Sequence, residues 1–264
     1  MSFKNRVVWI TGSSSGIGEE LAYAFAKSGA KLVLSSRRED ELNRVKKNCD
    51  LSDENILVLP LDLSELKNID PITQKVLEKF GGIDVLVNNG GISQRSYVKD
   101  TPINIDRKIM ETNFFGTVAI TKSVLPYMLK KNSGHIVVIS SISGKFGFYL
   151  RSAYSASKHA LHGFFESLRM EIFKDGIKVL IVCPGKIKTS ISINAITGNG
   201  GKHNRMDESQ DAGIPAALCA EKIIEAIKLN KEEVFIGGKE LRAIWIKRFF
   251  PNLFSKTIRK QKIE

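Results

Sequence analysis

The chain has 264 residues, of which 42% are hydrophobic and 26% are charged. This composition provides a hydrophobic core and excludes an intrinsically disordered chain. The longest uncharged stretches, one of which is 132–144, cover 13 residues, whereas a membrane-spanning helix needs about 20 mostly apolar residues. The formal net charge is +12, and half of this excess lies in residues 239–264. The charge therefore favours nucleic acid, an anionic membrane or a phosphorylated cofactor as partners.

The cysteines and the first residues bear on the cellular compartment. Cys49, Cys183 and Cys219 are an odd number, are scattered along the chain and lack metal-ligand spacing, which suits a reducing interior. Residues 1–6 lead straight into a strand pattern without an apolar signal region. We therefore expect a cytoplasmic protein.

Short apolar runs alternate with longer amphipathic segments, which predicts alternating strands and helices. Strands are predicted over residues 6–10, 31–35, 56–60, 83–87, 135–139, 177–182 and 233–236. Helices are predicted over residues 19–27, 39–48, 64–80, 103–131, 153–175 and 215–229. The strand runs are almost uninterrupted Val, Ile and Leu, which indicates burial on both faces of a sheet. Residues 1–238 are therefore predicted to form a single-domain α/β fold, a Rossmann-type doubly wound parallel sheet of about seven strands with helices on both faces.

A glycine-rich segment, Thr-Gly-Ser-Ser-Ser-Gly-Ile-Gly at 11–18, follows the first strand. Gly12 allows a sharp turn, Gly16 lets the backbone approach a pyrophosphate, and Gly18 lets the next helix pack against the sheet. The helix N-terminus adds free N–H groups and partial positive charge. A tight loop with helix-capping serines is the alternative. Because the segment joins a strand to a helix, it favours a dinucleotide site formed by Gly12, Ser13, Ser14, Ser15, Gly16, Ile17 and Gly18.

The end of the second strand bears on the choice of dinucleotide. Ser36 and Arg37 stand where an acidic residue would hold the ribose 2′-hydroxyl of NAD, and an arginine there accommodates the 2′-phosphate of NADP. The alternative is that Arg37 and Arg38 form a solvated surface. We favour NADP(H) as the cofactor, with Arg37 on the phosphate and Ser36 as a hydroxyl donor.

Tyr154 and Lys158 are four residues apart on a predicted helix and share one face. A nearby ammonium stabilises phenolate and lowers the pKa of a tyrosine, so that the phenol can exchange a proton with a carbonyl or carbinol oxygen. Ser141 follows the fifth strand and precedes Tyr154 by 13 residues, so it can hold the same oxygen. Ser140 and Ser143 flank Ser141 and compete for this role.

With these motifs in order, the chain resembles the short-chain dehydrogenase/reductase family over roughly residues 5 to 236. Asp62 is similar to the family's adenine-contacting Asp, and Asn88-Asn89-Gly90-Gly91 resembles its Asn-Asn-Ala-Gly element, with Gly90 in place of Ala. Asn113 matches the catalytic Asn, and residues 184–189 resemble the nicotinamide-side Pro-Gly-x-x-x-Thr segment. The resemblance adds these cofactor residues: Asp62, Leu63, Asn89, Gly90, Gly91, Tyr154, Lys158, Pro184, Gly185, Ile187 and Thr189.

The resemblance implies a role for each catalytic residue. Tyr154 is the acid/base, and Lys158 lowers its pKa and binds the nicotinamide ribose. Ser141 orients the substrate oxygen, and Asn113 sustains a proton relay. Many NADP-using members carry Lys or Arg just before the middle glycine, where this chain has Ser15, so Arg37 holds the 2′-phosphate with less help. The resemblance also implies a homodimer or homotetramer packed through the helices at 103–131 and 153–175.

Two segments outside the motifs have expected roles. Residues 186–213 are a long polar connection, and connections beyond about 12–15 residues are usually lids, binding loops or disorder; we expect this one to line the substrate site. Residues 239–264 combine cations with Trp245 and several phenylalanines, as interfacial helices do. Two interpretations stay open for this tail, peripheral membrane contact or packing on the body or a second subunit. His159 and His162 lack a third ligand, so no metal site is predicted.

The favoured function is an NADP(H)-dependent oxidoreductase that acts on a ketone or secondary alcohol. Phe146, Phe148, Tyr149 and Leu150 flank the expected pocket and favour an apolar lipid, steroid-like or acyl substrate. A 3-oxoacyl thioester reductase is the nearest alternative, and a non-catalytic NADP-binding scaffold is an alternative of another class. The body has no recognised nucleic-acid module, so no specific nucleic acid is expected as a partner.

Overall fold

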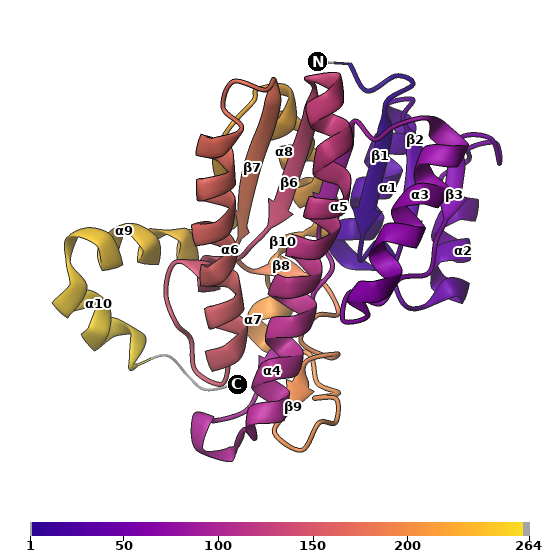
Figure 1. The fold of residues 1–264 in the computed structure, drawn as a ribbon. Helices are drawn as coiled ribbons and strands as arrows, with labels where there is room; N and C mark the ends of the chain where they lie inside the picture. The colour runs from indigo at the N-terminus through magenta and orange to yellow at the C-terminus, as the bar shows by residue number, and fades with distance from the viewer. Residues whose placement is uncertain (1, 261–264) are drawn as a thin grey trace.

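A seven-stranded parallel sheet forms the centre of the computed structural model, which describes residues 2–260 (Figure 1). The strand order is β11-β7-β6-β4-β1-β2-β3, and all neighbours are parallel. The strands are β1 (Val7–Thr11), β2 (Lys31–Ser35), β3 (Ile56–Val58), β4 (Val85–Asn88), β6 (Gly134–Ile139), β7 (Ile177–Pro184) and β11 (Glu233–Ile236). This arrangement confirms the prediction of a doubly wound α/β fold.

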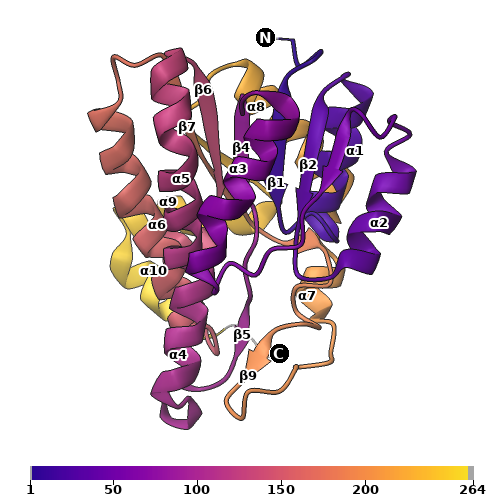
Figure 2. The ribbon, with the colours of Figure 1, turned by 45° about the vertical axis from the view of Figure 1, so that its right-hand side comes forward.

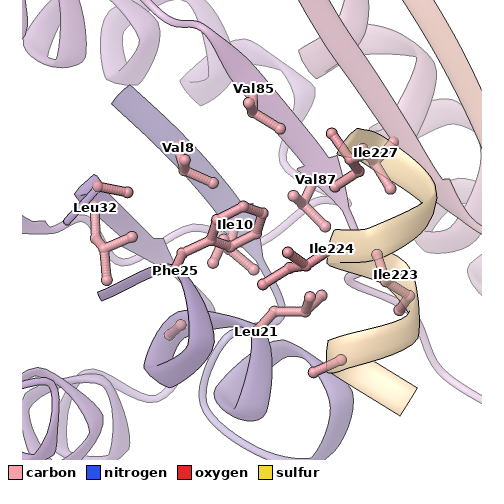
Figure 3. Close-up of a cluster of buried hydrophobic side chains, with 14 of the residues drawn as sticks. Val8, Ile10, Leu21, Phe25, Leu32, Val85, Val87, Ile223, Ile224 and Ile227 are labelled. Carbon is pink, nitrogen blue, oxygen red and sulfur yellow. The ribbon is translucent and has the colours of Figure 1, made fainter. Parts of the chain in front are cut away.

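Helices cover both faces of the sheet because successive strand side chains point to opposite faces. Val8 and Ile10 face a cluster with α1 (Gly16–Lys27), α2 (Glu39–Asn48) and α8 (Ala216–Lys228). Val7 and Trp9 face a second cluster with α3 (Ile69–Phe80), α5 (Gly116–Lys131) and α6 (Ser152–Glu171). Figure 3 shows the first cluster, in which α1 and α8 side chains meet β1 and β4: Val8, Ile10, Leu21, Phe25, Val85, Val87, Ile223, Ile224 and Ile227.

The order of the strands creates a crevice at their carboxyl ends. The chain leaves β1 toward β2 and β3 on one side and returns through β4 on the other, so β1 has β2 and β4 as its neighbours. Connections that diverge in this way leave space beside the strand ends, where α/β proteins bind ligands. Thr11 ends β1 and Asn88 ends β4, which brings the predicted glycine turn and the Asn-Asn-Gly-Gly segment to this crevice.

The predicted helix over 103–131 is interrupted in the structure. It consists of α4 (Ile103–Met110), a π-helical turn (Glu111–Phe115) and α5. The predicted helix over 64–80 is likewise shorter, with a 3₁₀ turn (Leu66–Asn68) before α3, and Pro71 lies in the first turn of α3, where a proline N–H is not needed. Other predicted elements differ by a few residues at their ends, which is where helices and strands are least well defined.

The connection at 186–213 has short elements of its own. It contains β8 (Ile187–Lys188), β9 (Ile196–Thr197) and α7 (Glu208–Asp211). β8 pairs with β10 (Ile214–Pro215), and β9 pairs with β5 (Gln94–Arg95). Figure 2 shows β5, β9 and α7 gathered below the central sheet, on the side of the carboxyl ends of its strands. Short 3₁₀ turns complete the described fold at Val98–Asp100, Ile142–Gly144 and Lys239–Leu241.

Residues 239–260 of the tail fold as a 3₁₀ turn followed by α9 (Arg242–Phe249) and α10 (Pro251–Ile258). Figure 1 shows these helices, in yellow, beside α6. Phe254 packs edge-on against Phe146, with ring centroids 5.0 Å apart, whereas Trp245 and Phe249 stack on each other and stay 61% and 63% exposed. Residues 261–264 of the predicted tail lie outside the described residues. Across residues 2–260, every helix is too short or too polar to cross a membrane.

Candidate active site

A cavity of about 540 Å³ opens at the carboxyl ends of the strands. Its walls come from the glycine turn, the ends of β2, β4, β6 and β7, the start of α6 and the connection at 186–213. The predicted cofactor and catalytic residues in its lining are Gly12, Ser14, Ser15, Gly16, Ile17, Ser36, Arg37, Asp62, Leu63, Asn89, Gly90, Gly91, Ser141, Tyr154, Lys158, Pro184, Gly185, Ile187 and Thr189. The predicted residues thus meet in one place, although they come from distant parts of the chain.

The glycine turn is fixed by its neighbours on β1 and β4. Gly12 has φ +65° and Gly16 has φ +59°, a backbone region that side chains disfavour. The Asn89 side-chain amide donates to the carbonyl oxygens of Thr11 and Gly12, both at 3.0 Å. A Cβ on Gly16 would lie 3.0 Å from the Thr189 methyl group. The turn therefore has the shape and the bare backbone that a pyrophosphate requires, and Thr189 lies over it.

The start of α1 leaves donors available beside this turn. Ser15 precedes the helix, and its side chain makes no capping hydrogen bond. The first N–H groups of a helix have no partner within the helix, and they carry partial positive charge. These groups fit a cofactor phosphate. Gly90 stands where the family has Ala, and the Leu63 side chain fills that space, since an added Cβ would lie 2.6 Å from Leu63 Cδ1.

Two arginines lie at the far end of the cavity, where the chain leaves β2. Arg37 and Arg38 both line the cavity and are exposed. Arg38 Nη2 donates to Ser14 Oγ at 3.3 Å, so this guanidinium reaches back to the phosphate turn. Of these two arginines, the sequence predicts only Arg37 as a cofactor residue. Arg38 follows it directly, and the choice between two adjacent arginines requires the direction of each side chain.

Tyr154, Ser141 and Lys158 meet at the other end of the cavity. The side chain of Ser141 forms a hydrogen bond with Tyr154. Lys158 donates to the Ile139 carbonyl oxygen at 2.7 Å, and its Nζ lies 5.8 Å from the centre of the Tyr154 ring. Burial lowers the pKa of Lys158 to about 8. Both side chains come from one turn of α6 and face the end of β6.

The electrostatics of Tyr154 differ from the expectation. Burial raises the pKa of Tyr154, and the hydrogen bond from Ser141 together with the guanidinium groups of Arg151 and Arg95 opposes this rise. The sequence predicts Lys158 as the group that lowers the pKa of this phenol. Arg151 and Arg95 are the cations that act on it here: Arg151 precedes Tyr154 by three residues, whereas Arg95 comes from the distant β5.

The competing serines have other partners. Ser140 Oγ donates to the Lys158 carbonyl oxygen at 3.2 Å and lies 3.1 Å from His162 Nε2. The Ser143 backbone N–H donates to Ser141 Oγ at 3.1 Å, which orients the Ser141 hydroxyl. Ser141 is therefore the serine of this group that forms the hydrogen bond with Tyr154.

Ser13, Gly18 and Asn113, three of the predicted site residues, lie outside the cavity lining. The Ser13 hydroxyl donates to the Ser35 carbonyl oxygen at 3.4 Å, and Gly18 packs against the turn, since an added Cβ would lie 2.5 Å from Asn89 Nδ2. Asn113 is fully buried in the π-helical turn. These residues shape the site from behind its walls.

The Asn113 side chain ties three segments together. Its Oδ1 accepts from the Ile92 N–H at 2.8 Å, and its Nδ2 donates to the Ile92 carbonyl oxygen and to Ser157 Oγ, both at 3.0 Å. Ile92 follows Gly91, which lines the cavity, and Ser157 precedes Lys158. Asn113 thus holds the β4 end against the helix that carries Tyr154.

Glu240, from the tail, lines the cavity and was not predicted. Its Oε1 accepts from the backbone N–H groups of Lys186 at 2.8 Å and Gly238 at 3.0 Å. Burial raises the pKa of Glu240, but the hydrogen bonds from these backbone groups outweigh it and keep the pKa below its usual value. Glu240 therefore secures the turn at Gly185 from the side of the tail. Its sequence neighbourhood gives no sign of this role.

One cluster of possible metal ligands lies behind the site, where no metal site was predicted. The ligand atoms of His162, Cys183 and Glu233 lie within 4.8 Å of one another. Lys145 Nζ lies 2.5 Å from Glu233 Oε1, so a cation already neutralises this carboxylate. Burial lowers the pKa of His162 to about 4.

Comparisons with known proteins identify the family of this chain. Residues 6–199 match the family described as short chain dehydrogenase. The chain is 44% identical over 262 residues to the "Dehydrogenase/reductase SDR family protein 7-like" of Anopheles gambiae, covering 97% of this chain and 83% of that protein. It is 45% identical over 236 residues to the human "Dehydrogenase/reductase SDR family member 7", covering 88% of this chain and 70% of that protein.

Solved structures share the fold over almost the whole chain. A short-chain dehydrogenase from Streptomyces avermitilis is 27% identical, with a TM-score of 0.81 over 97% of this chain and 96% of that one. A short chain dehydrogenase/reductase from Burkholderia phymatum, crystallised with NAD, has the same fold, with a TM-score of 0.84 at 23% identity over 96% of each chain. The sequence matches place the chain in the short-chain dehydrogenase/reductase family, whose members are oxidoreductases that use a nicotinamide cofactor.

Proposed function

We propose that the protein is an NADP(H)-dependent oxidoreductase that interconverts a ketone and a secondary alcohol. The observation that carries this proposal is the position of the buried Tyr154 phenol, hydrogen-bonded to Ser141, in the cavity that also contains the glycine turn and Arg37. The glycine turn and the arginines would hold a dinucleotide in the cavity, which extends from the end of β2 to Tyr154. The protein supplies the orientation and the proton, and the cofactor supplies the hydride.

The proton step follows from the geometry of Tyr154. In the reducing direction, Tyr154 would give its phenolic proton to the carbonyl oxygen, while the carbonyl carbon would take up the hydride that a bound nicotinamide cofactor supplies; together these give the alcohol. Ser141 donates to the same oxygen and holds it beside the phenol. The cations around Tyr154 stabilise the phenolate that remains until it is reprotonated. In the oxidising direction, the phenolate accepts the proton of the alcohol.

Apolar walls next to Tyr154 support an apolar substrate. Phe146, Phe148, Tyr149 and Leu150 all line the cavity. Phe146 is 1% exposed, and its ring centroid lies 4.8 Å from that of Phe148. Such a surface fits the hydrocarbon part of a lipid, steroid-like or acyl carbonyl compound, because burying apolar area contributes about 25 cal/mol per Å².

Replacement of Tyr154 tests the proposed reaction. We expect Tyr154→Phe to lower kcat by about 10²–10⁴-fold, because the proton donor is lost while the shape is kept. The control is Tyr127→Phe, which removes the phenol that accepts from Gln74 on the outer side of α5. Turnover is measured from NADPH absorbance with a panel of ketones. Unchanged turnover in Tyr154→Phe would contradict the proposed chemistry.

Replacement of the arginines at the β2 end tests the proposed cofactor. We expect kcat/KM to favour NADPH over NADH, and Arg37→Ala or Arg38→Ala to reduce this preference about 10- to 100-fold by removing charge-assisted hydrogen bonds to the 2′-phosphate. Lys47→Ala is the control, since Lys47 is an exposed cation on α2 outside the cavity. A wild-type preference for NADH would reject the NADP(H) assignment.

We also propose that the tail contacts an anionic membrane surface. Trp245, Phe249, Phe250 and Leu253 are between 54% and 63% exposed, and they are interleaved with basic residues. Each basic residue near an anionic bilayer contributes about 1 kcal/mol of binding. In a density gradient, we expect the full chain to float with vesicles that contain phosphatidylserine and a variant ending at Lys239 to remain in the bottom fraction. Equal flotation of the two proteins would contradict the proposed membrane contact.

A further inference from the structure

Two guanidinium groups, one buried and one partly buried, share one carboxylate at the rim of the cavity. Arg95, from β5, and Arg151, just before α6, both form ion pairs with Asp207, which precedes α7. The exposed fractions of the three side chains are 3%, 23% and 1%. The connection at 186–213 is therefore fastened to two segments of the body through a cluster with one more cation than anions.

Arg95 alone satisfies the carboxylate. Its Nε donates to Asp207 Oδ1 at 3.3 Å and its Nη2 to Oδ2, which is the bidentate arrangement. Its Nη1 donates to Ser93 Oγ at 3.0 Å and to the Gln94 carbonyl oxygen at 2.6 Å. All of its nitrogens thus have partners, and the loop would be anchored without a second arginine.

Arg151 has donors to spare. Its Nη2 donates to Asp207 Oδ2 at 2.8 Å, which is its one side-chain hydrogen bond among residues 2–260, and its guanidinium carbon lies 5.8 Å from the Phe148 ring centre. Arg95 and Arg151 line the cavity, whereas Asp207 does not. Arg151 also precedes Tyr154 by three residues on the same segment. The excess positive charge on the Arg151 guanidinium therefore faces the cavity near the Tyr154 hydroxyl.

A second cluster of two cations and one carboxylate, at Asp84, is more exposed than the cluster at Asp207. Arg6 and Lys131 share Asp84 at the opposite end of the sheet, at 3.0 Å and 2.6 Å. Their side chains are 42% and 48% exposed, so water screens the excess charge. Arg151 is about half as exposed and lies over the Phe148 ring, where an uncompensated charge costs more than in water. An anion bound in the cavity would remove this cost.

We infer that Arg151 is a specificity-determining residue that recognises an anionic group, a carboxylate or a phosphate, on the substrate. The inference rests on the proposed function and narrows its substrate class to carbonyl compounds with an apolar chain and one anionic end. The rings of Phe146 and Phe148 contact the chain, Tyr154 and Ser141 hold the carbonyl oxygen, and the Arg151 guanidinium pairs with the anion. Arginine suits this role because its planar donors match both carboxylate and phosphate oxygens.

Matched acids and esters test the inference. The probes are acetoacetate, 4-oxopentanoate and 3-oxooctanoate, each compared with its methyl ester, and kcat/KM is measured with NADPH. We expect the wild type to favour the acid of at least one pair by about tenfold or more, mainly through KM. Arg151→Gln should reduce this acid-to-ester ratio about 10- to 100-fold, and Arg151→Lys should recover part of it. Arg6→Gln, from the cluster at Asp84, is the matched control and should leave the ratio unchanged.

A binding measurement separates the inference from turnover. At 10 mM of each probe, the acid should raise the thermal unfolding temperature of the wild type more than its ester, and this difference should vanish in Arg151→Gln and shrink with added salt. The inference would be overturned if the wild type showed no difference between acids and esters in kcat/KM or in thermal shift. It would also be overturned if that difference were the same in Arg151→Gln. The acid-to-ester ratios and thermal shifts test the role of Arg151, whereas Tyr154→Phe tests the proposed reaction. Failure of one proposal can therefore be told apart from failure of the other.

Discussion

Gly18 shows how one missing side chain shapes the cofactor turn. An added Cβ would meet the Gly12 carbonyl oxygen and lie 2.5 Å from Asn89 Nδ2, the amide that braces the turn. We expect Gly18→Ala to displace the turn and raise the Kd for NADPH about tenfold, the equivalent of roughly 1.4 kcal/mol. Isothermal titration calorimetry measures this value.

A second glycine provides the control for this change. Gly163 lies in α6, and an added Cβ there has no neighbour within 4 Å. Gly163→Ala should leave the Kd unchanged and stabilise the helix by about 1 kcal/mol, because alanine loses less backbone entropy. An unaltered Kd in Gly18→Ala would mean that the turn tolerates the methyl group.

His162 makes stability depend on pH. Burial lowers the pKa of His162 to about 4 from its usual value of 6.5, so the folded protein keeps the ring neutral while the unfolded chain protonates it. Stability is therefore complete above pH 6.5 and falls as the pH drops toward 4, by about 2–3 kcal/mol for this group. His162→Gln should remove this loss. Urea unfolding at pH 7.5 and 5 measures it, and parallel pH curves for variant and wild type would contradict the assignment.

Most residues that a motif of fixed spacing singles out in the sequence lie together in the cavity. The segment at 11–18 and the pair Tyr154 and Lys158 could be located because neighbouring positions carry the pattern. Arg95, one of the two arginines that act on Tyr154, could not be located in this way, because it lies 59 positions away and meets Tyr154 only through β5. Local spacing carries no information about such contacts.

The π-helical turn between α4 and α5 is the element on which the site depends. It widens the helix at Asn113, whose side chain then satisfies the backbone N–H and carbonyl oxygen of Ile92. We expect Asn113→Ala to leave these buried groups unpaired, to lower the free energy of unfolding by about 2–4 kcal/mol and to reduce kcat. Chemical denaturation and steady-state kinetics measure both effects.

Asn104 offers a comparison within the same helical region. It lies in α4 and is exposed, so Asn104→Ala should change neither stability nor kcat appreciably. If Asn113→Ala were equally mild, the hydrogen bonds to Ile92 would not hold the site together.

Elements were predictable from the sequence where the hydrophobic period is simple. The helix over Glu39–Asn48 and the strand over Glu233–Ile236 have the predicted bounds. The π-helical turn could not be predicted, because helical periodicity continues across it and its extra residue per turn is fixed by tertiary hydrogen bonds. The short strands β5 and β9 have two residues each and pair across 102 positions, which is too little pattern to detect.

At the scale of the whole molecule, exposed apolar residues near the end of α6 favour self-association. Met170 is 74% exposed and Phe173 is 71% exposed, and large apolar groups gathered on a surface mark interaction sites. We propose a homodimer or homotetramer packed through this helix. Phe173→Asp should lower the molar mass determined by light scattering, whereas Leu229→Asp, at the end of α8, should not. A monomeric wild type would refute the proposed oligomer.

Glu240 has a consequence for the molecule as a whole, because one carboxylate joins the tail to the turn beside Gly185. If the proposed membrane contact immobilises α9, it should also restrain this turn, and membrane binding would then be thermodynamically linked to dinucleotide binding. By reciprocity, a saturating dinucleotide should strengthen vesicle binding by the same factor by which vesicles tighten the dinucleotide. The affinity of the enzyme for its dinucleotide would then differ between the membrane-bound and the free protein.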